Sequence, residues 1–125
     1  MGINSITRVF KTARFSKEAR KIKIKDSALC DAIAQVMLGQ GDDLGGGVFK
    51  KRLNDNLHRS IILTKGAKYW IFEYLFAKKD RDNISDDELT AFRLLAKSYA
   101  GLSAAQLSCL LADHDLLEIC HDNPK

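Results

Sequence analysis

The sequence predicts an α+β domain: a small antiparallel sheet with two N-terminal helices packed on one face and two C-terminal helices. Three observations lead to this fold class. Apolar residues recur at helical spacing before residue 40, β-branched and aromatic residues dominate residues 48–77, and helix-capping patterns follow after residue 84. The chain has 125 residues, 46% of them hydrophobic, which is enough for a single domain covering residues 1–125.

A strand and two helices are expected at the N-terminal end. Residues 7–10 are a short strand candidate, and residues 16–22 have the composition of a basic helix with Ser16 as its N-cap. The second helix is predicted to begin near Asp26 or Ser27. Its apolar residues share one face: Leu29, Ile33, Val36 and Met37.

Three strands are predicted in the middle of the chain, at residues 48–53, 59–64 and 69–76. Turn-forming residues separate them, which favours an antiparallel meander. A glycine run at residues 45–47 precedes the first of these strands. Because the run lacks the longer pattern and the following helix of a phosphate-binding P-loop, we interpret it as a turn or a bend at the sheet edge.

Two helices and a short strand complete the prediction. Ser85 and Glu88 have the spacing of a capping box, as do Ser103 and Gln106, so each serine is expected to begin a helix. Residues 116–119 are a candidate for the last strand.

The cysteines indicate a reduced, cytoplasmic protein. Cys30, Cys109 and Cys120 are odd in number and lack C-x-x-C spacing, so neither a disulfide framework nor a zinc site is predicted. No apolar run is long enough to cross a membrane or to act as a secretory signal. We therefore expect no metal, no cofactor and no contact with a membrane.

Positive charge is concentrated in parts of the chain. The formal net charge is +4. Basic residues dominate residues 8–25 and cluster again at 50–52 and 78–81, whereas acidic residues concentrate after residue 80. One side of the molecule can therefore offer a positive surface to the phosphates of a nucleic acid.

Two motifs resemble those of the RelE toxin superfamily. Residues 44–52 read LGGGVFKKR, and residues 76–89 read FAKKDRDNISDDEL. With the predicted order of strands and helices, they are similar to the phage-associated HigB-like branch of that superfamily. The resemblance covers nearly the whole chain, from Arg8 to Ile119.

The resemblance implies a toxin of a type II toxin–antitoxin pair. RelE and HigB proteins enter the ribosomal A site and cleave the mRNA there, without a metal or cofactor, and so inhibit translation. The implied partners are a cognate antitoxin, typically a helix-turn-helix HigA-like protein in this branch, and the ribosome with its mRNA. Operator DNA is expected to be bound only through the antitoxin complex.

Metal-free RNA cleavage needs a defined set of side chains. The 2′-hydroxyl attacks the adjacent phosphorus, which requires a base near the 2′-oxygen, an acid near the departing 5′-oxygen and positive charge around the phosphate. Guanidinium groups match phosphate oxygens in a bidentate way. A lysine amine can act as the base when neighbouring cations favour its neutral form.

Strand geometry is expected to bring several cations together. Residues two apart share a face of a strand, so Lys50 and Arg52 point together while Lys51 points the other way. Arg59 begins the next strand just after a short turn, so we expect it beside Arg52. Its neighbour His58 can act as a base or stack on a nucleobase, although its side chain should point away from Arg59.

The basic residues after the third central strand complete the predicted site. The predicted catalytic residues are Arg59, Lys50, Arg52 and Lys79, and the residues predicted to contact RNA or its phosphates are Lys51, His58, Lys78 and Arg81. By resemblance, Arg59 corresponds to the arginine that RelE-type enzymes place on the scissile phosphate. The chain lacks the base-stacking tyrosine that RelE has shortly after this region, so Tyr74 and Trp70 are alternative stacking residues.

Each assignment has a structural alternative. Lys50, Lys51 and Arg52 are also what a solvated strand or a protected sheet edge would contain. The cations at 78–81 can form ion pairs with the aspartates around them, and Arg81 can hold the next helix through its acidic first turn. Both aromatic stacking candidates are also typical of a core or a sheet face.

Two other functions are compatible with the same fold. One is a non-enzymatic growth inhibitor that resembles the ParE branch, which poisons DNA gyrase. The other is a degenerate toxin that only binds an antitoxin. The retained set of basic residues favours RNA cleavage over both.

Overall fold

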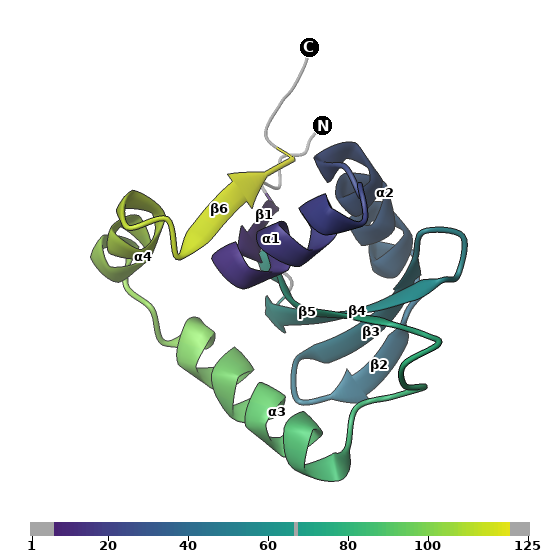
Figure 1. The fold of residues 1–125 in the computed structure, drawn as a ribbon. Coiled ribbons are helices and arrows are strands. Elements are labelled where there is room, and N and C mark those ends of the chain that lie inside the picture. The colour runs from purple at the N-terminus through teal and green to yellow at the C-terminus, as the bar shows by residue number, and fades with distance from the viewer. Residues whose placement is uncertain (1–6, 67, 121–125) are drawn as a thin grey trace.

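The computed structural model describes residues 7–66 and 68–120, without the side chain of Lys65. Six strands and four helices follow one another in this part of the chain (Figure 1). Their bounds are β1 Arg8–Thr12, α1 Ala13–Lys21, α2 Asp26–Met37, β2 Asp42–Gly45, β3 Val48–Leu53, β4 His58–Lys65, β5 Tyr69–Ala77, α3 Asp86–Ala100, α4 Ala104–Ala112 and β6 Leu116–Ile119.

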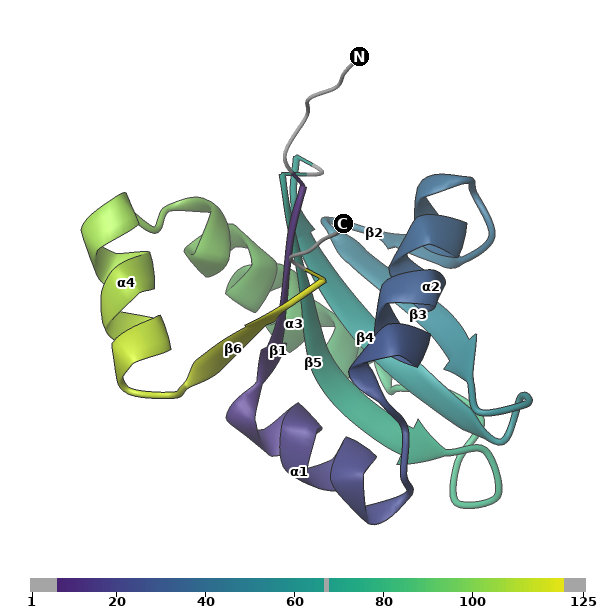
Figure 2. The ribbon, with the colours of Figure 1, turned by 90° about the horizontal axis from the view of Figure 1, so that it is seen from above.

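The strands form one mixed sheet in the order β2-β3-β4-β5-β1-β6. Strands β2 to β5 pair antiparallel, so the predicted meander is confirmed. Strand β1 lies parallel to β5 and antiparallel to β6, and Figure 2 shows it between them. Its register with β5 runs only from Arg8–Tyr69 to Lys11–Phe72. The second half of β5 therefore continues beyond β1, toward the end of the sheet where β3 also ends.

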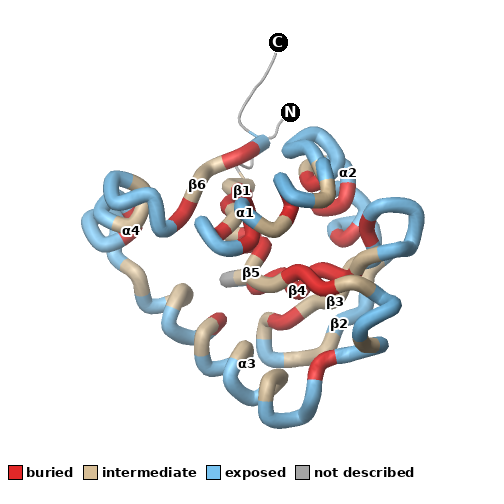
Figure 3. Tube along the Cα trace, in the orientation of Figure 1, coloured by how far each residue is buried: buried red, intermediate tan, exposed pale blue. Residues whose placement is uncertain are grey.

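Helices cover both faces of the sheet (Figure 1). On one face, α1 and α2 pack on strand residues that include Val9, Ile62 and Phe72. On the other, α3 packs on Val48, Ile61 and Leu63, and α4 closes a third cluster around β1 and β6. Figure 3 shows that burial is densest along the central strands. The predicted α+β class, with two N-terminal helices on one face and two C-terminal helices, is confirmed.

Helix α1 begins one turn earlier than predicted. Thr12 is its N-cap, because the Thr12 Oγ1 atom accepts a hydrogen bond from the Phe15 backbone N–H at 3.0 Å. Ser16 is buried inside the helix, so its assignment as the N-cap is wrong. The apolar face already starts at Phe15 and continues to Ala19, which extends the helix back to the end of β1.

The other helices begin where the sequence predicts. Helix α2 starts at Asp26 and buries Leu29, Ile33 and Val36, whereas Met37 is 48% exposed and does not belong to the buried face. Both C-terminal helices carry the predicted capping boxes, with Ser85 and Ser103 as N-caps. None of the described helices has the length and apolarity needed to cross a lipid bilayer.

The glycine run forms the turn between β2 and β3, and it docks helix α3. Arg93 of α3 donates hydrogen bonds to the backbone oxygens of Leu44 and Gly45. Gly47 has φ +84°, and a Cβ atom there would lie 2.9 Å from the Thr64 carbonyl oxygen. Glycine is therefore required for backbone conformation and close approach, which confirms the interpretation as a turn.

Cys30 and Cys120 form a disulfide, which contradicts the prediction of three reduced cysteines. Their Cα atoms lie 5.6 Å apart although 90 positions separate them in the sequence. The bond links α2 to the residue after β6. Cysteine spacing does not reveal a pair that only the folded sheet brings together. Cys109 is exposed and free.

Candidate functional site

The predicted site residues gather mainly around two neighbouring loops at one end of the sheet. The β3–β4 turn contains Asn54, Asp55 and Asn56, all with left-handed φ angles between 54° and 71°. Beside it lies the loop that follows β5. The Lys78 backbone N–H donates a 2.9 Å hydrogen bond to the Leu57 carbonyl oxygen. This bond ties the turn to the loop and fixes the backbone between them.

Arg59 is a buried cation at the start of β4. The residue is only 7% exposed, and its Nη1 atom donates to the carbonyl oxygens of Asn56 at 3.0 Å and His58 at 3.2 Å. Arg52 is its direct cross-strand partner, as predicted. Within the described residues, no carboxylate pairs with the Arg59 guanidinium. Burying a charge without a counter-ion is costly, so an anion bound here would compensate it.

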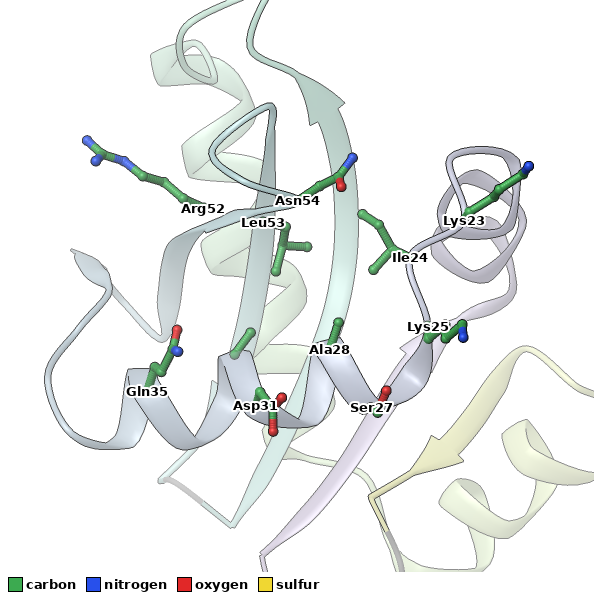
Figure 4. A pocket seen from close by; sticks show the side chains of 11 residues that line it. Lys23, Ile24, Lys25, Ser27, Ala28, Asp31, Gln35, Arg52, Leu53 and Asn54 are labelled. Carbon is green, nitrogen blue, oxygen red and sulfur yellow. The ribbon is translucent and has the colours of Figure 1, made fainter.

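The three basic residues of β3 do not act as one group. Arg52 is exposed, and Figure 4 shows its side chain extending away from α2 while Leu53 points inward. The Lys50 Nζ atom lies 3.9 Å from Asp42 Oδ2 of β2. The Lys51 Nζ atom donates to the Gln40 carbonyl oxygen at 3.0 Å. Both lysines thus have partners on the β2 side, where all three basic residues border a pocket of about 390 Å³.

His58 is separated from Arg59 by strand alternation, as expected. It is the cross-strand partner of Leu53 and Ala77, and its Nδ1 atom lies 3.1 Å from Asn54 Nδ2. His58 lines two neighbouring pockets of about 410 and 660 Å³. Lys79 lines both of them as well, so the structure brings these two predicted residues together.

Lys78 and Lys79 are exposed in the loop after β5. In the parts of the chain described, neither ammonium group has a hydrogen-bond or ion-pair partner. The alternative that these lysines are neutralised by the surrounding aspartates is therefore wrong. Both ammonium groups are available to an anionic ligand.

Arg81 holds the start of α3. Its Nη1 and Nη2 atoms pair with the two carboxylate oxygens of Glu88, and its Nε atom donates to the Asn83 carbonyl oxygen at 3.0 Å. Its guanidinium carbon also lies 5.5 Å from the centre of the Phe76 ring. The hydrogen bonds from Arg81 and from the Ser85 backbone N–H lower the pKa of Glu88 to about 2. The expected contact with the acidic first turn of the helix is confirmed.

Comparison with known proteins adds the family. A model of the family described as the RelE toxin of the RelE/RelB toxin–antitoxin system matches residues 7–119. The chain belongs to the RelE toxin family. No curated protein and no solved structure matches it. As a RelE-family toxin, the protein has a cognate antitoxin as its partner, and the match spans all eight predicted site residues.

The two aromatic candidates differ in their access to solvent in this RelE-family toxin. Trp70 is buried and packs against Phe49 with ring centres 5.5 Å apart, so it is not available to stack on a base. Tyr74 is half-buried between Phe76 and Phe92, and it lines the pocket of about 410 Å³ that His58 and Lys79 share.

Sequence reasoning missed two apolar residues that lie beside the predicted site residues. Leu57 in the β3–β4 turn and Ile22 at the end of α1 line the pocket of about 660 Å³. Leu57 is 60% exposed. An isolated leucine in a turn otherwise made of asparagine, aspartate and histidine was the available signal.

In the ranges 7–66 and 68–120, no three histidine, cysteine, aspartate or glutamate residues are grouped so as to hold a metal ion.

Proposed function

We propose that this RelE-family toxin cleaves mRNA on the ribosome and thereby inhibits translation in the cytoplasm. The reaction is attack of a 2′-hydroxyl on the adjacent phosphorus, with protein side chains in place of a metal or cofactor. The observation that carries the proposal is the state of Arg59: a nearly buried guanidinium, held by two carbonyl oxygens and without a carboxylate partner among the described residues.

Arg59 is suited to the charge that develops on the phosphate. Its Nη1 atom is occupied by the turn, which leaves Nε and Nη2 to donate to phosphate oxygens. Because the turn already orients the group, little reorganisation is needed when the transition state forms. Arg52 stands beside Arg59 on the same face of the sheet and adds a second cation.

Lys79 and Lys50 complete the proposed catalytic set. Lys79 is the more favourable of the two, because its ammonium is free whereas Lys50 lies near Asp42. We assign Lys51, His58, Lys78 and Arg81 to contacts with the RNA or its phosphates. For Arg81 this contact is additional to its pairing with Glu88.

We further propose a HigB-like toxin with a helix-turn-helix, HigA-like antitoxin. The support is the resemblance of residues 44–52 and 76–89 to that branch. In this arrangement, the antitoxin blocks the toxin and the complex binds operator DNA through the antitoxin alone.

Mapping of mRNA ends in a reconstituted translation reaction tests the proposal. The wild-type toxin is expected to produce new 5′ ends inside the reading frame. The Arg59→Ala and Lys79→Ala variants are expected to cleave roughly 100-fold more slowly, because each removes a group that stabilises the transition state. Arg20→Ala removes an exposed cation of α1 and serves as the matched control.

Two results would contradict the proposal. The first is a double variant, Arg59→Ala with Lys79→Ala, that arrests growth as fully as the wild type. The second is inhibition of gyrase supercoiling by the wild type without any mRNA cleavage, which would establish the ParE-like alternative. Circular dichroism and antitoxin binding show whether each variant is folded.

A further inference from the structure

A pocket of about 660 Å³ lies beside the proposed cleavage site. It is bounded by the end of α1, the β3–β4 turn and the loop after β5. Its volume falls in the range of roughly 300–1,000 Å³ that is usual for small-molecule sites. Its walls combine apolar and cationic side chains. The apolar side chains have no role in the proposed cleavage reaction, so they call for a separate explanation.

The apolar wall consists of Ile22, Leu57 and Ala77. Leu57 is held in place although it is 60% exposed: its N–H donates to the Asn54 oxygen at 3.0 Å, and its oxygen accepts from the Lys78 N–H at 2.9 Å. With its backbone fixed, Leu57 presents its exposed side chain at a defined place in the pocket wall. An apolar side chain there can pack against the face of an aromatic ligand.

The rim of the pocket is cationic. Lys78 and Lys79 line it, and neither ammonium has a partner within the described residues. Asp82 is the single acidic residue of the lining. A carboxylate can accept a hydrogen bond from the amino group of a base, but it repels phosphate.

The neighbouring pocket of about 410 Å³ shares His58 and Lys79 with this one; it lacks Asp82 but is lined by two other acidic residues, Glu18 and Asp80. A phosphate at the wall that the two pockets share meets Lys79 and His58 there. A ligand with a flat aromatic part and an adjacent phosphate matches this arrangement, and a nucleotide of single-stranded RNA has both.

We propose that this pocket binds one base of the RNA substrate, with Leu57 and Ile22 against the base and Lys79 on its phosphate. The inference rests on the proposed function, because it assumes that RNA is the substrate. Leu57 is a positioning residue: it places the nucleotide beside Lys79, the member of the proposed catalytic set that lines the same pocket.

Binding of short oligonucleotides tests the subsite separately from cleavage. Two probes are used. The intact probe is a 2′-O-methylated ribotetranucleotide, which has no 2′-hydroxyl to react, and the abasic probe is the same molecule with one base removed. Titrations are followed by the NMR signals of the Leu57 methyl groups and by fluorescence anisotropy. We expect Leu57→Ala to weaken binding of the intact probe roughly fivefold or more, as expected for the loss of contact with one base.

The abasic probe and a matched leucine provide the controls. Leu57→Ala should leave the affinity for the abasic probe unchanged, because that probe lacks the base that Leu57 is proposed to contact. Leu94→Ala removes a leucine of similar exposure, 63%, from α3 and should leave both affinities unchanged. In the cleavage reaction, Leu57→Ala should raise KM and alter the choice of cleavage sites more than it lowers kcat.

Three results would overturn the subsite: unchanged affinity of Leu57→Ala for every probe, equal loss for intact and abasic probes, or loss of antitoxin binding without loss of RNA binding. The last would assign the pocket to the antitoxin. Failure of the proposed function has a different signature, because a wild-type toxin that cleaves no mRNA can still bind the intact probe through Leu57.

Discussion

Arg59 owes its position to the turn that precedes it. The guanidinium is held by two carbonyl oxygens, that of Asn56 inside the turn and that of His58 at the start of β4. Lysine can retain the charge but not the arrangement, because a single ammonium cannot satisfy the turn and present two further aligned donors. This distinction separates a role of charge alone from a role of geometry.

We predict that Arg59→Lys loses most of the cleavage activity, by roughly 100-fold, although it keeps the net charge. The measurement is the single-turnover rate of mRNA cleavage on the ribosome, with Arg20→Lys as a control for a general effect of the replacement. A rate within a few-fold of the wild type would show that charge alone suffices.

At the residue scale, two placements around the candidate site could be predicted from the sequence. Because the turn after β3 is short, Arg52 and Arg59 had to face each other, and they are cross-strand partners. The pairing of Arg81 with the first turn of α3 was also foreseeable, because that turn contains three acidic residues and Arg81 lies shortly before it in the sequence. Whether Lys50 is free or paired was not, because Asp42 belongs to a strand that the sequence did not indicate.

At the scale of elements, the start of α3 is fixed by a group that titrates. Glu88 accepts hydrogen bonds from the Ser85 backbone N–H and from Arg81. Its pKa lies at about 2, below its ordinary value of 4.5, so folding is favoured by the ionised carboxylate. This stabilisation is fully present above pH 4.5 and is lost as the pH falls toward 2.

Glu88→Gln is therefore predicted to lower the urea midpoint at neutral pH, and the difference from the wild type should shrink between pH 4.5 and about 2. Urea unfolding at closely spaced pH values measures it. Glu18→Gln, which removes an exposed i,i+3 pair with Lys21 on α1, should have little effect at any pH. A difference for Glu88→Gln that does not depend on pH would contradict the role of its charge.

Elements were predictable where local chemistry decides them. The capping boxes of α3 and α4 and the aromatic strand β5 have strong local patterns, and each was found in place. Strand β2 was not predicted because it has only four residues, begins with two aspartates and pairs only with β3 at the sheet edge. The partner of β1 also could not be read from the sequence, since the parallel pairing with β5 depends on where α1 and α2 return the chain.

For the whole molecule, the disulfide is the main feature that sequence reasoning got wrong. Cys30 lies on α2, and Cys120 follows β6 at the far edge of the sheet order. Loop-closure entropy in the unfolded chain makes a cross-link over 90 positions strongly stabilising. The bond therefore adds stability in an oxidising environment, whereas in the reducing cytoplasm proposed for this toxin the fold rests on its non-covalent contacts alone.

Cys120→Ser is predicted to destabilise the oxidised protein by about 2–4 kcal/mol, and dithiothreitol should have a similar effect on the wild type. Urea unfolding with and without the reductant measures both. Cys109→Ser replaces the exposed free cysteine and should change neither value. A wild type whose unfolding does not respond to dithiothreitol would contradict a formed disulfide.

The Cys30–Cys120 bond also closes the chain into a covalent ring. Every element from β2 to β6 lies inside this ring, whereas β1 and α1 lie outside it and are held by non-covalent contacts. A single proteolytic cut in a loop between β2 and β6 opens the ring but does not separate the two pieces. On a denaturing gel, such a nicked toxin would migrate as two fragments only after reduction. A cut between α1 and α2 would separate the N-terminal strand and helix on the same gel without any reductant.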